Sequence, residues 1–156
     1  MALTFNTSGP CVPDEHYMLS PAKRFERIIE LIDQKKYITV VAGRQTGKTT
    51  ALQWLVKRLN QADKYAAVWV DLQTAREQPK LSIAFTTVLN EFDMALERDL
   101  PDIERPAHSE IMKDPSTAIL KYLQNISRQA SRPLVVFVDE ADGLVGEAMV
   151  SFLVSV

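Results

Sequence analysis

The stretch VVAGRQTGKTT, residues 40–50, places two glycines, a lysine and three threonines between an apolar run and a helical pattern. The preceding residues 37–42 (YITVVA) are rich in β-branched side chains and of strand length, which predicts a β-strand. A helix is predicted from residue 49 onward, because four apolar residues share one of its faces: Leu52, Leu55, Val56 and Leu59. A strand that turns into a helix through glycine gathers backbone N–H groups in one concavity, which favours a phosphate chain.

Residues 42–49 (AGRQTGKT) match the phosphate-loop pattern G-x-x-x-x-G-K-[ST] except at the first position, where Ala42 replaces glycine. This departure is mild, because a strand end does not require a positive φ and the neighbouring Gly43 adds backbone freedom. The alternative is a glycine-rich turn with an ordinary surface lysine, and the strand-before, helix-after context disfavours it. The stretch therefore predicts a Walker A nucleotide-binding loop.

Reach and chemistry give each part of this loop a role. Gly47 lets the backbone approach the phosphates, and Lys48 places its ammonium against the β- and γ-phosphates. Thr49 offers its hydroxyl to a magnesium ion, and Thr50 can add a hydrogen bond to the α-phosphate. For Arg44 a phosphate contact and a solvent-exposed position are both open. The remaining members of the predicted nucleotide-binding loop contribute mainly backbone: Ala42, Gly43, Gln45 and Thr46.

A second acidic site follows residues 134–138 (LVVFV), an apolar run of strand length that ends in Asp139 and Glu140. Because the carboxyl ends of parallel strands meet at one edge of a sheet, we expect both carboxylates beside Lys48. Asp139 would then hold Mg²⁺ as a Walker B aspartate does, and Glu140 would polarise the attacking water. The alternative is a pair of solvated acids at a strand end. For Asp142 a contribution to the site and a helix-capping role are both open.

The remaining pattern alternates strands with helices. It predicts one more strand at residues 66–72 and a loop with at most one short turn at 99–113. It predicts further helices over residues 21 to about 34, 81–96, 114 to about 129, and 148–156. Asp114 followed by Pro115 is the predicted cap of the helix that begins at residue 114. Strands separated by helices indicate βαβ units, and near-continuous apolar strands fit a sheet covered on both faces. The predicted fold class is α/β: a P-loop NTPase-like three-layer αβα sandwich with a mostly parallel sheet.

The composition excludes several other classes. With 156 residues, one domain is expected, and a net charge of −2 gives no global field for nucleic acid or an acidic membrane. No apolar stretch reaches about 18 residues, so we expect no membrane span. The single cysteine, Cys11, cannot form an internal disulfide, which fits a reducing, cytoplasmic setting. With one cysteine, His16 and His108 do not predict a metal site.

With both motifs in place, the chain resembles the AAA-like P-loop ATPases of bacteria, close to the signal-transduction (STAND) and archaeal-type ATPase groups. Three stretches follow the family's order: HYMLSPAKRFERIIELID, ITVVAGRQTGKTTALQWL and LVVFVDEADGL. The resemblance extends from about Asn6 to the end and implies ATP and Mg²⁺ as ligands. It also implies that the irregular N-terminal segment, residues 1–20, lines the adenine side, with Gly9-Pro10 and His16-Tyr17 as candidates. Packing of Tyr17 on the sheet is the alternative.

The chain departs from this family after the Walker B strand. The family core orders five strands 5-1-4-3-2, and its fourth strand bridges the two Walker strands. We expect residues 21–156 to form only part of that core, without strands four and five, the sensor residue or an arginine finger. Because each unsatisfied buried backbone group costs about 1–3 kcal/mol, three outcomes are open. The chain is a fragment, strands one and three pair directly, or a partner completes the sheet.

The expected function is that of an ATP-binding, Mg²⁺-dependent ATPase domain that couples ATP to an unknown partner or substrate. Lys48 and Glu140 are the expected catalytic residues, and Thr49 and Asp139 the expected metal ligands. A nucleotide-dependent switch with little turnover is one alternative, and a truncated fragment without independent activity is another. A protein partner and a homo-oligomer are both open, whereas membrane and nucleic acid are not indicated.

Overall fold

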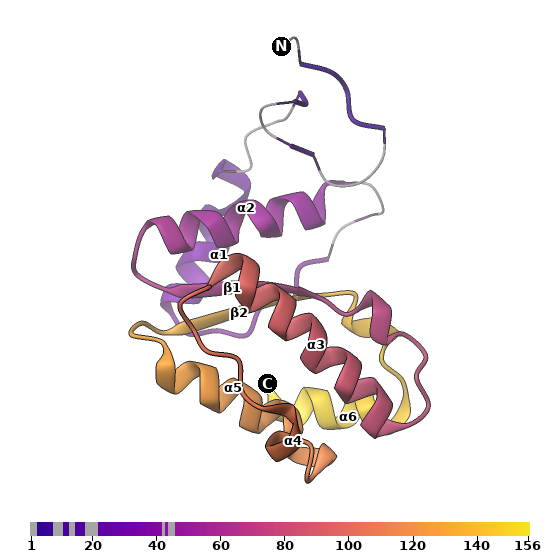
Figure 1. Ribbon diagram of the computed structural model, residues 1–156. Helices are drawn as coiled ribbons and strands as arrows, with labels where there is room; N and C mark the ends of the chain where they lie inside the picture. The colour runs from indigo at the N-terminus through magenta and orange to yellow at the C-terminus, as the bar shows by residue number, and fades with distance from the viewer. Residues whose placement is uncertain (1–2, 8–10, 13–14, 18–21, 42, 44–45) are drawn as a thin grey trace. The chain divides into compact units, whose positions relative to one another are not determined.

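The computed structural model describes residues 3–7, 11–12, 15–17, 22–41, 43 and 46–156. The chain divides into two compact units, residues 1–58 and 59–156, and each is described by itself. The order of helices and strands is shown in Figure 1. Helix α2 (Lys48–Gln61) begins in the first unit and ends in the second.

The first unit contains helix α1 (Ala22–Asp33), as predicted within two residues at either end. Its predicted first residue, Pro21, lies outside the residues that the structure describes. The helix ends in a Schellman-type turn: Lys35 has a φ of 55°, and the N–H of Lys36 donates to the carbonyl of Leu31 at 3.0 Å. This turn sets where the helix stops before the run that leads to the phosphate loop.

The predicted strand at residues 37–42 is wrong over its described part. Residues 37–41 are irregular, and Tyr37 and Val41 are each 90% exposed, while Ala42 lies outside the described residues. A strand needs the backbone hydrogen bonds of a neighbour, and β-branched side chains alone do not supply them. The sheet in the described part of the chain has two strands, β1 and β2.

The second unit follows the predicted alternation closely. Both of its strands agree with the sequence pattern within one residue, and α4 is the short turn allowed for within the loop at residues 99–113. Its elements are β1 (Ala66–Asp71), a 3₁₀ turn η1 (Gln73–Ala75), α3 (Leu81–Asp99), α4 (His108–Ile111), η2 (Pro115–Thr117), α5 (Ala118–Gln129), β2 (Leu134–Asp139), η3 (Ala141–Gly143) and α6 (Gly146–Ser155).

The predicted cap at Asp114 is confirmed, although the first turn it starts is the 3₁₀ turn η2. The Asp114 carboxylate accepts the N–H of Ser116 at 3.1 Å, and Pro115 occupies the first position of the turn. Hydrogen bonds from the hydroxyls of Ser116 and Thr117 lower the pKa of Asp114 from its ordinary value. Local sequence therefore decides where the helix α5 region begins.

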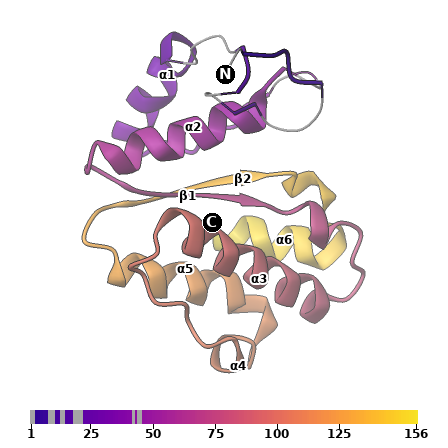
Figure 2. The same cartoon turned by 45° about the horizontal axis from the view of Figure 1, so that its top comes forward.

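Strands β1 and β2 pair in parallel over six residues, from Ala66 opposite Leu134 to Asp71 opposite Asp139. Figure 2 shows α3, α5 and α6 together on one side of these two strands. The buried core between them contains Val68 and Val70 from β1 and large side chains from the helices: Phe85, Phe92, Tyr122 and Phe152. The predicted α/β class with a parallel sheet is confirmed, with one helical layer on this face of the sheet.

The outer edge of β1 is closed by a side chain. The N–H groups of Ala66 and Leu72 donate toward β2 at 3.0 Å each, so Ala67 and Trp69 direct their backbone groups to the opposite edge. There the Asn60 amide accepts the N–H of Ala67 at 2.7 Å and donates to its carbonyl at 2.9 Å. Asn60 thus replaces one residue of a neighbouring strand.

The next position along this edge is closed by a neighbouring pair, Arg98 and Asp99. The Asp99 carboxylate accepts the N–H of Trp69 at 3.0 Å. The Arg98 guanidinium donates to the carbonyl of Trp69 and lies 4.9 Å from the centroid of the Trp69 ring. Closed edges do not recruit further strands. This placement agrees with the expected strand order, in which the second strand of the chain lies at the rim of the sheet.

A partly buried polar cluster links three helices of this unit. The fully buried Tyr122 donates its hydroxyl to Asp93 at 2.7 Å, and Nε2 of His108 lies 2.9 Å from the other oxygen of that carboxylate. Burial, and after it the hydrogen bond to Asp93, raise the pKa of Tyr122 well above its ordinary value. The cluster ties α4 and α5 to α3.

We predict that Asn60→Ala lowers the free energy of unfolding by about 2–3 kcal/mol, because both backbone groups of Ala67 lose their partner. Urea denaturation measures this loss. The control is Gln61→Ala, an exposed neighbour on the same helix, which should stay within about 0.5 kcal/mol of the parent. Equal midpoints for Asn60→Ala and the parent would show that the edge contributes no net stability.

We also predict that Tyr122→Phe costs about 1–2 kcal/mol near neutral pH, through the lost hydrogen bond to Asp93. A tyrosine whose pKa is raised in the folded state contributes stability below its unfolded pKa, about 10, and loses that contribution as the pH rises further. When the pH is raised from about 8 to about 11, the urea midpoint should therefore fall less in Tyr122→Phe than in the parent. The exposed Tyr17→Phe is the control, and an equal fall in all three proteins would contradict the assignment.

Candidate functional site

The turn before α2 depends on Gly47. Its φ is +78°, a left-handed backbone conformation that residues other than glycine adopt only at a cost in free energy. The Gly47 carbonyl accepts the N–H of Ala51 at 2.9 Å, which is the first hydrogen bond leading into the helix. Glycine at this position therefore lets the chain turn directly into the helix, which begins at the next residue.

The described part of the loop is also held by Thr46. Its hydroxyl donates to the carbonyl of Gly43 at 2.9 Å, which closes a short polar turn. The sequence predicted mainly a backbone contribution from Thr46, so this side-chain role was missed. Three other members of the predicted loop lie outside the described residues: Ala42, Arg44 and Gln45.

Lys48, Thr49 and Thr50 are the first three residues of α2, a helix of 14 residues. The first N–H groups of a helix have no partner within it, and the helix dipole adds positive potential there. All three residues are half-buried, so their N–H groups and side chains lie in a partly shielded environment. This is the position in which a phosphate chain would meet lysine, hydroxyl and backbone donors together.

Thr50 also contacts the N-terminal segment. The N–H of Cys11 donates to the Thr50 hydroxyl oxygen at 3.1 Å, and Asn6 donates to the Cys11 sulfur at 3.7 Å. No sequence pattern indicated this contact, because 39 residues separate its two members. The hydroxyl keeps its own proton to donate, so Thr50 can bind a further acceptor.

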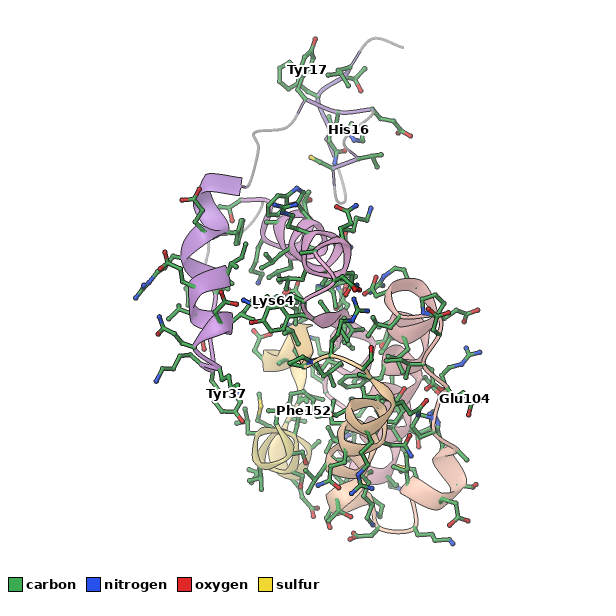
Figure 3. The ribbon with its side chains drawn as sticks, turned by 90° about the vertical axis from the view of Figure 1, so that its left-hand side faces the viewer. His16, Tyr17, Tyr37, Lys64, Glu104 and Phe152 are labelled. Atoms are coloured by element: carbon green, nitrogen blue, oxygen red, sulfur yellow. The ribbon has the colours of Figure 1, made fainter. Side chains whose placement is uncertain are left out.

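Two of the candidate adenine-side residues, His16 and Tyr17, lie in the same N-terminal segment and are labelled in Figure 3. Nδ1 of His16 accepts the N–H of Val12 at 2.9 Å, and residue 16 forms an isolated parallel bridge with Thr4. The ring of Tyr17 lies 5.0 Å from that of Phe5, and both rings are more than half exposed. The other candidates, Gly9 and Pro10, lie outside the described residues.

In the second unit, β2 ends at Asp139, which is only 4% exposed. Its Oδ1 accepts the N–H of Glu140 at 3.2 Å, and Glu140 has a φ of +56°. A non-glycine residue in this left-handed region costs about 1–2 kcal/mol and persists only where its surroundings hold it. The backbone of the predicted water-activating residue is therefore constrained.

Asp142 lies exposed in the turn η3 that follows. The following helix, α6, begins at Gly146 with Val145 at its N-cap and no side-chain cap. A capping role for Asp142 at α6 is therefore wrong. Its exposure leaves the side chain accessible to solvent at the same end of the strand as Glu140.

The sequence analysis missed Asp71, the register partner of Asp139. Both strands end in aspartate, and the Asp71 carboxylate accepts the N–H of Gln73 at 2.9 Å. The signal was present in the sequence, because AAVWVD at residues 66–71 repeats the pattern of LVVFVD at 134–139. The carboxyl edge of the sheet is consequently more acidic than one motif suggested.

The donors at these sites suit Mg²⁺. The described residues contain no group of three His, Cys, Asp or Glu side chains arranged to hold a metal ion. Mg²⁺ at a nucleotide site needs only one or two protein oxygens besides phosphate and water. The Thr49 hydroxyl and the buried Asp139 carboxylate are oxygen donors of that kind.

Among the described residues, no helix is both long and apolar enough to cross a bilayer.

Comparison with known proteins gives one match. A family model described as an AAA domain matches residues 31–156, which include both motifs. Neither the search of curated proteins nor the search of solved structures returned a match. Since the family match covers most of the sequence, the chain belongs to the AAA domain family, the AAA-like P-loop ATPases.

Proposed function

We propose that this chain binds ATP with Mg²⁺ and hydrolyses it, and that it couples this cycle to a protein partner or to further copies of itself. The observation that carries the proposal is the start of α2. There the left-handed Gly47 leads directly into Lys48 and Thr49, the first two residues of the helix. Family membership supports nucleotide binding independently of that geometry.

The phosphate chain would be bound by the loop and the first turn of α2. Lys48 neutralises charge on the β- and γ-phosphates, and the helix N–H groups supply directional donors. Thr50 donates its remaining hydroxyl proton to the α-phosphate while its oxygen stays bonded to Cys11. The rest of the predicted loop contributes backbone donors and, at one position, a guanidinium: Ala42, Gly43, Arg44, Gln45 and Thr46.

The hydrolytic step would use the acidic end of β2. We place Asp139 and Thr49 as the oxygen ligands of Mg²⁺, which would supply charge neutralisation at the phosphates. Glu140 accepts a proton from the attacking water and orients it toward the γ-phosphate. This assignment requires Asp139 and Glu140 to lie beside Lys48 when the nucleotide is bound.

A second candidate is a nucleotide-dependent switch with little turnover. The hydrogen bond between Cys11 and Thr50 favours it, because it joins the N-terminal segment to the first turn of α2. A nucleotide that bound with different affinity to two arrangements of this contact would shift their populations. The adenine-side role of His16 and Tyr17 belongs to the same proposal. ATP binding without phosphate release, restored by a partner, would favour the switch.

We predict that Lys48→Ala weakens ATP binding about 10- to 100-fold, because a charge-assisted contact of about 1.5–3 kcal/mol is lost. Isothermal titration calorimetry with Mg-ATP measures the change. Lys57→Ala is the matched control, an exposed lysine on the same helix, and its Kd should equal that of the parent. An unchanged Kd in Lys48→Ala would contradict the nucleotide loop.

We predict that Glu140→Gln keeps the Kd for Mg-ATP within about threefold of the parent and lowers phosphate release about 10²- to 10⁴-fold. The amide keeps the shape of the side chain but does not take the proton from water. The exposed Glu147→Gln serves as control and should hydrolyse ATP at the parental rate. Parental turnover in Glu140→Gln would exclude Glu140 as the base.

A further inference from the structure

The turns that follow β1 and β2 are joined by a backbone hydrogen bond. The N–H of Glu77 donates to the carbonyl of Gly143 at 2.9 Å. We propose that this contact, with the packing of Arg76 against Gly143, forms a clasp that positions Glu140 for hydrolysis. This proposal rests on the proposed function, because it gives Glu140 its catalytic role. Arg76 and Gly143 are positioning residues within it.

Close packing explains why residue 143 is glycine. A Cβ there would lie 3.2 Å from the Cβ of Arg76 and 3.3 Å from both its Cγ and its Nε. Gly143 is not among the residues with positive φ, so alanine is compatible with its backbone conformation. Space is therefore tight for a side chain, and the neighbour that would have to shift by a few tenths of an ångström belongs to the other turn. A methyl group at residue 143 would push the two turns apart.

The clasp reaches Glu140 through short, consecutive hydrogen bonds. The N–H of Gly143 donates to the carbonyl of Glu140 at 3.1 Å, on the C-terminal side of the catalytic candidate. On its N-terminal side, the N–H of Leu72 donates to the carbonyl of Asp139 at 3.0 Å. The peptide groups on both sides of Glu140 are thus bonded, one to the end of β1 and the other to the clasped turn.

Strain is concentrated at the same place. Glu140 has a φ of 56° and Glu77 a φ of 57°, so each of the two touching turns contains a non-glycine residue in the left-handed region. Such conformations cost about 1–2 kcal/mol each and are kept only where the surroundings over-determine them. The hydrogen bond from Glu77 to Gly143 supplies that constraint to both turns. Released from it, Glu140 would relax toward negative φ, and its carboxylate would change direction.

The clasp should affect turnover more than nucleotide affinity. None of its members belongs to the predicted phosphate loop, so ground-state binding of ATP does not depend on it. The direction of the Glu140 carboxylate matters when water attacks, and a displacement of about 1 Å at a reacting group can cost about 10²-fold in rate. A weakened clasp therefore lowers kcat and leaves the Kd for ATP unchanged.

Gly143→Ala tests this division. We expect phosphate release to fall about 10- to 100-fold, with the Kd for Mg-ATP within about twofold of the parent. Nuclear magnetic resonance without nucleotide should show faster hydrogen exchange of the Glu77 amide and a shifted Glu140 amide resonance. Lys80→Ala is the control. Lys80 lies exposed at the end of the connection between β1 and α3, and its side chain makes no capping hydrogen bond to α3, so this variant should behave as the parent.

The double variant Gly143→Ala with Arg76→Gly separates packing from general damage. Removal of the Arg76 side chain takes away all three atoms that the new methyl group would meet. We expect it to restore the Glu140 resonance and most of the turnover, and to remain folded even if Gly143→Ala alone does not. Failure of this restoration would overturn the proposal.

The remaining outcomes distinguish the clasp from the proposed function. Parental turnover in Gly143→Ala, together with an unshifted Glu140 amide, would overturn the clasp while ATP hydrolysis stands. No phosphate release from the parent protein would contradict the proposed function. The resonance of the Glu140 amide and the hydrogen exchange of the Glu77 amide would then still show whether the clasp fixes this turn, because both are measured without nucleotide.

Discussion

The structure of the second unit depends on the parallel pairing of β1 with β2. Six consecutive residue pairs align Ala66 with Leu134 and Asp71 with Asp139, and this register brings two acid-terminated strands to one edge. Parallel strands need a long connection, which here runs through α3, α4 and α5. A slip of one residue would turn Val68 and Val70 away from the helices and move Asp139 from the end of the strand. Packing and site geometry are thus set by the same register.

The two edges of this small sheet differ. Side chains of Asn60, Arg98 and Asp99 bond the backbone groups that Ala67 and Trp69 direct to the outer edge of β1, so that edge is closed at these two positions. The sheet can therefore gain a strand only beside β2. The expected strand order of the AAA domain family places further strands on that side. Residues 37–41, which the pattern assigned to a strand, are irregular in the described chain.

Sequence alone predicted those elements whose signal is local. The strands ending in Asp71 and Asp139, the cap at Asp114 and the start of the helix after Gly47 each follow from a few adjacent residues. The strand at residues 37–42 failed because strand formation needs a partner as well as propensity. The contacts of Cys11 with Thr50 and of Glu77 with Gly143 join residues 39 and 66 positions apart, and no periodicity marks them. The motif residues could be predicted because their chemistry requires fixed spacing, whereas the groups that would orient them depend on the tertiary fold.

The central claim is that one Mg-nucleotide contacts both the start of α2 and the end of β2. Paramagnetic broadening by Mn²⁺-ATP, in which Mn²⁺ stands for Mg²⁺, tests it directly in an amide nuclear magnetic resonance spectrum. The account predicts that the amides of Lys48 and Thr49 and those of Asp139 and Glu140 all broaden at the same low Mn²⁺ concentration. Broadening confined to Lys48 and Thr49, with sharp signals from Asp139 and Glu140, would contradict it.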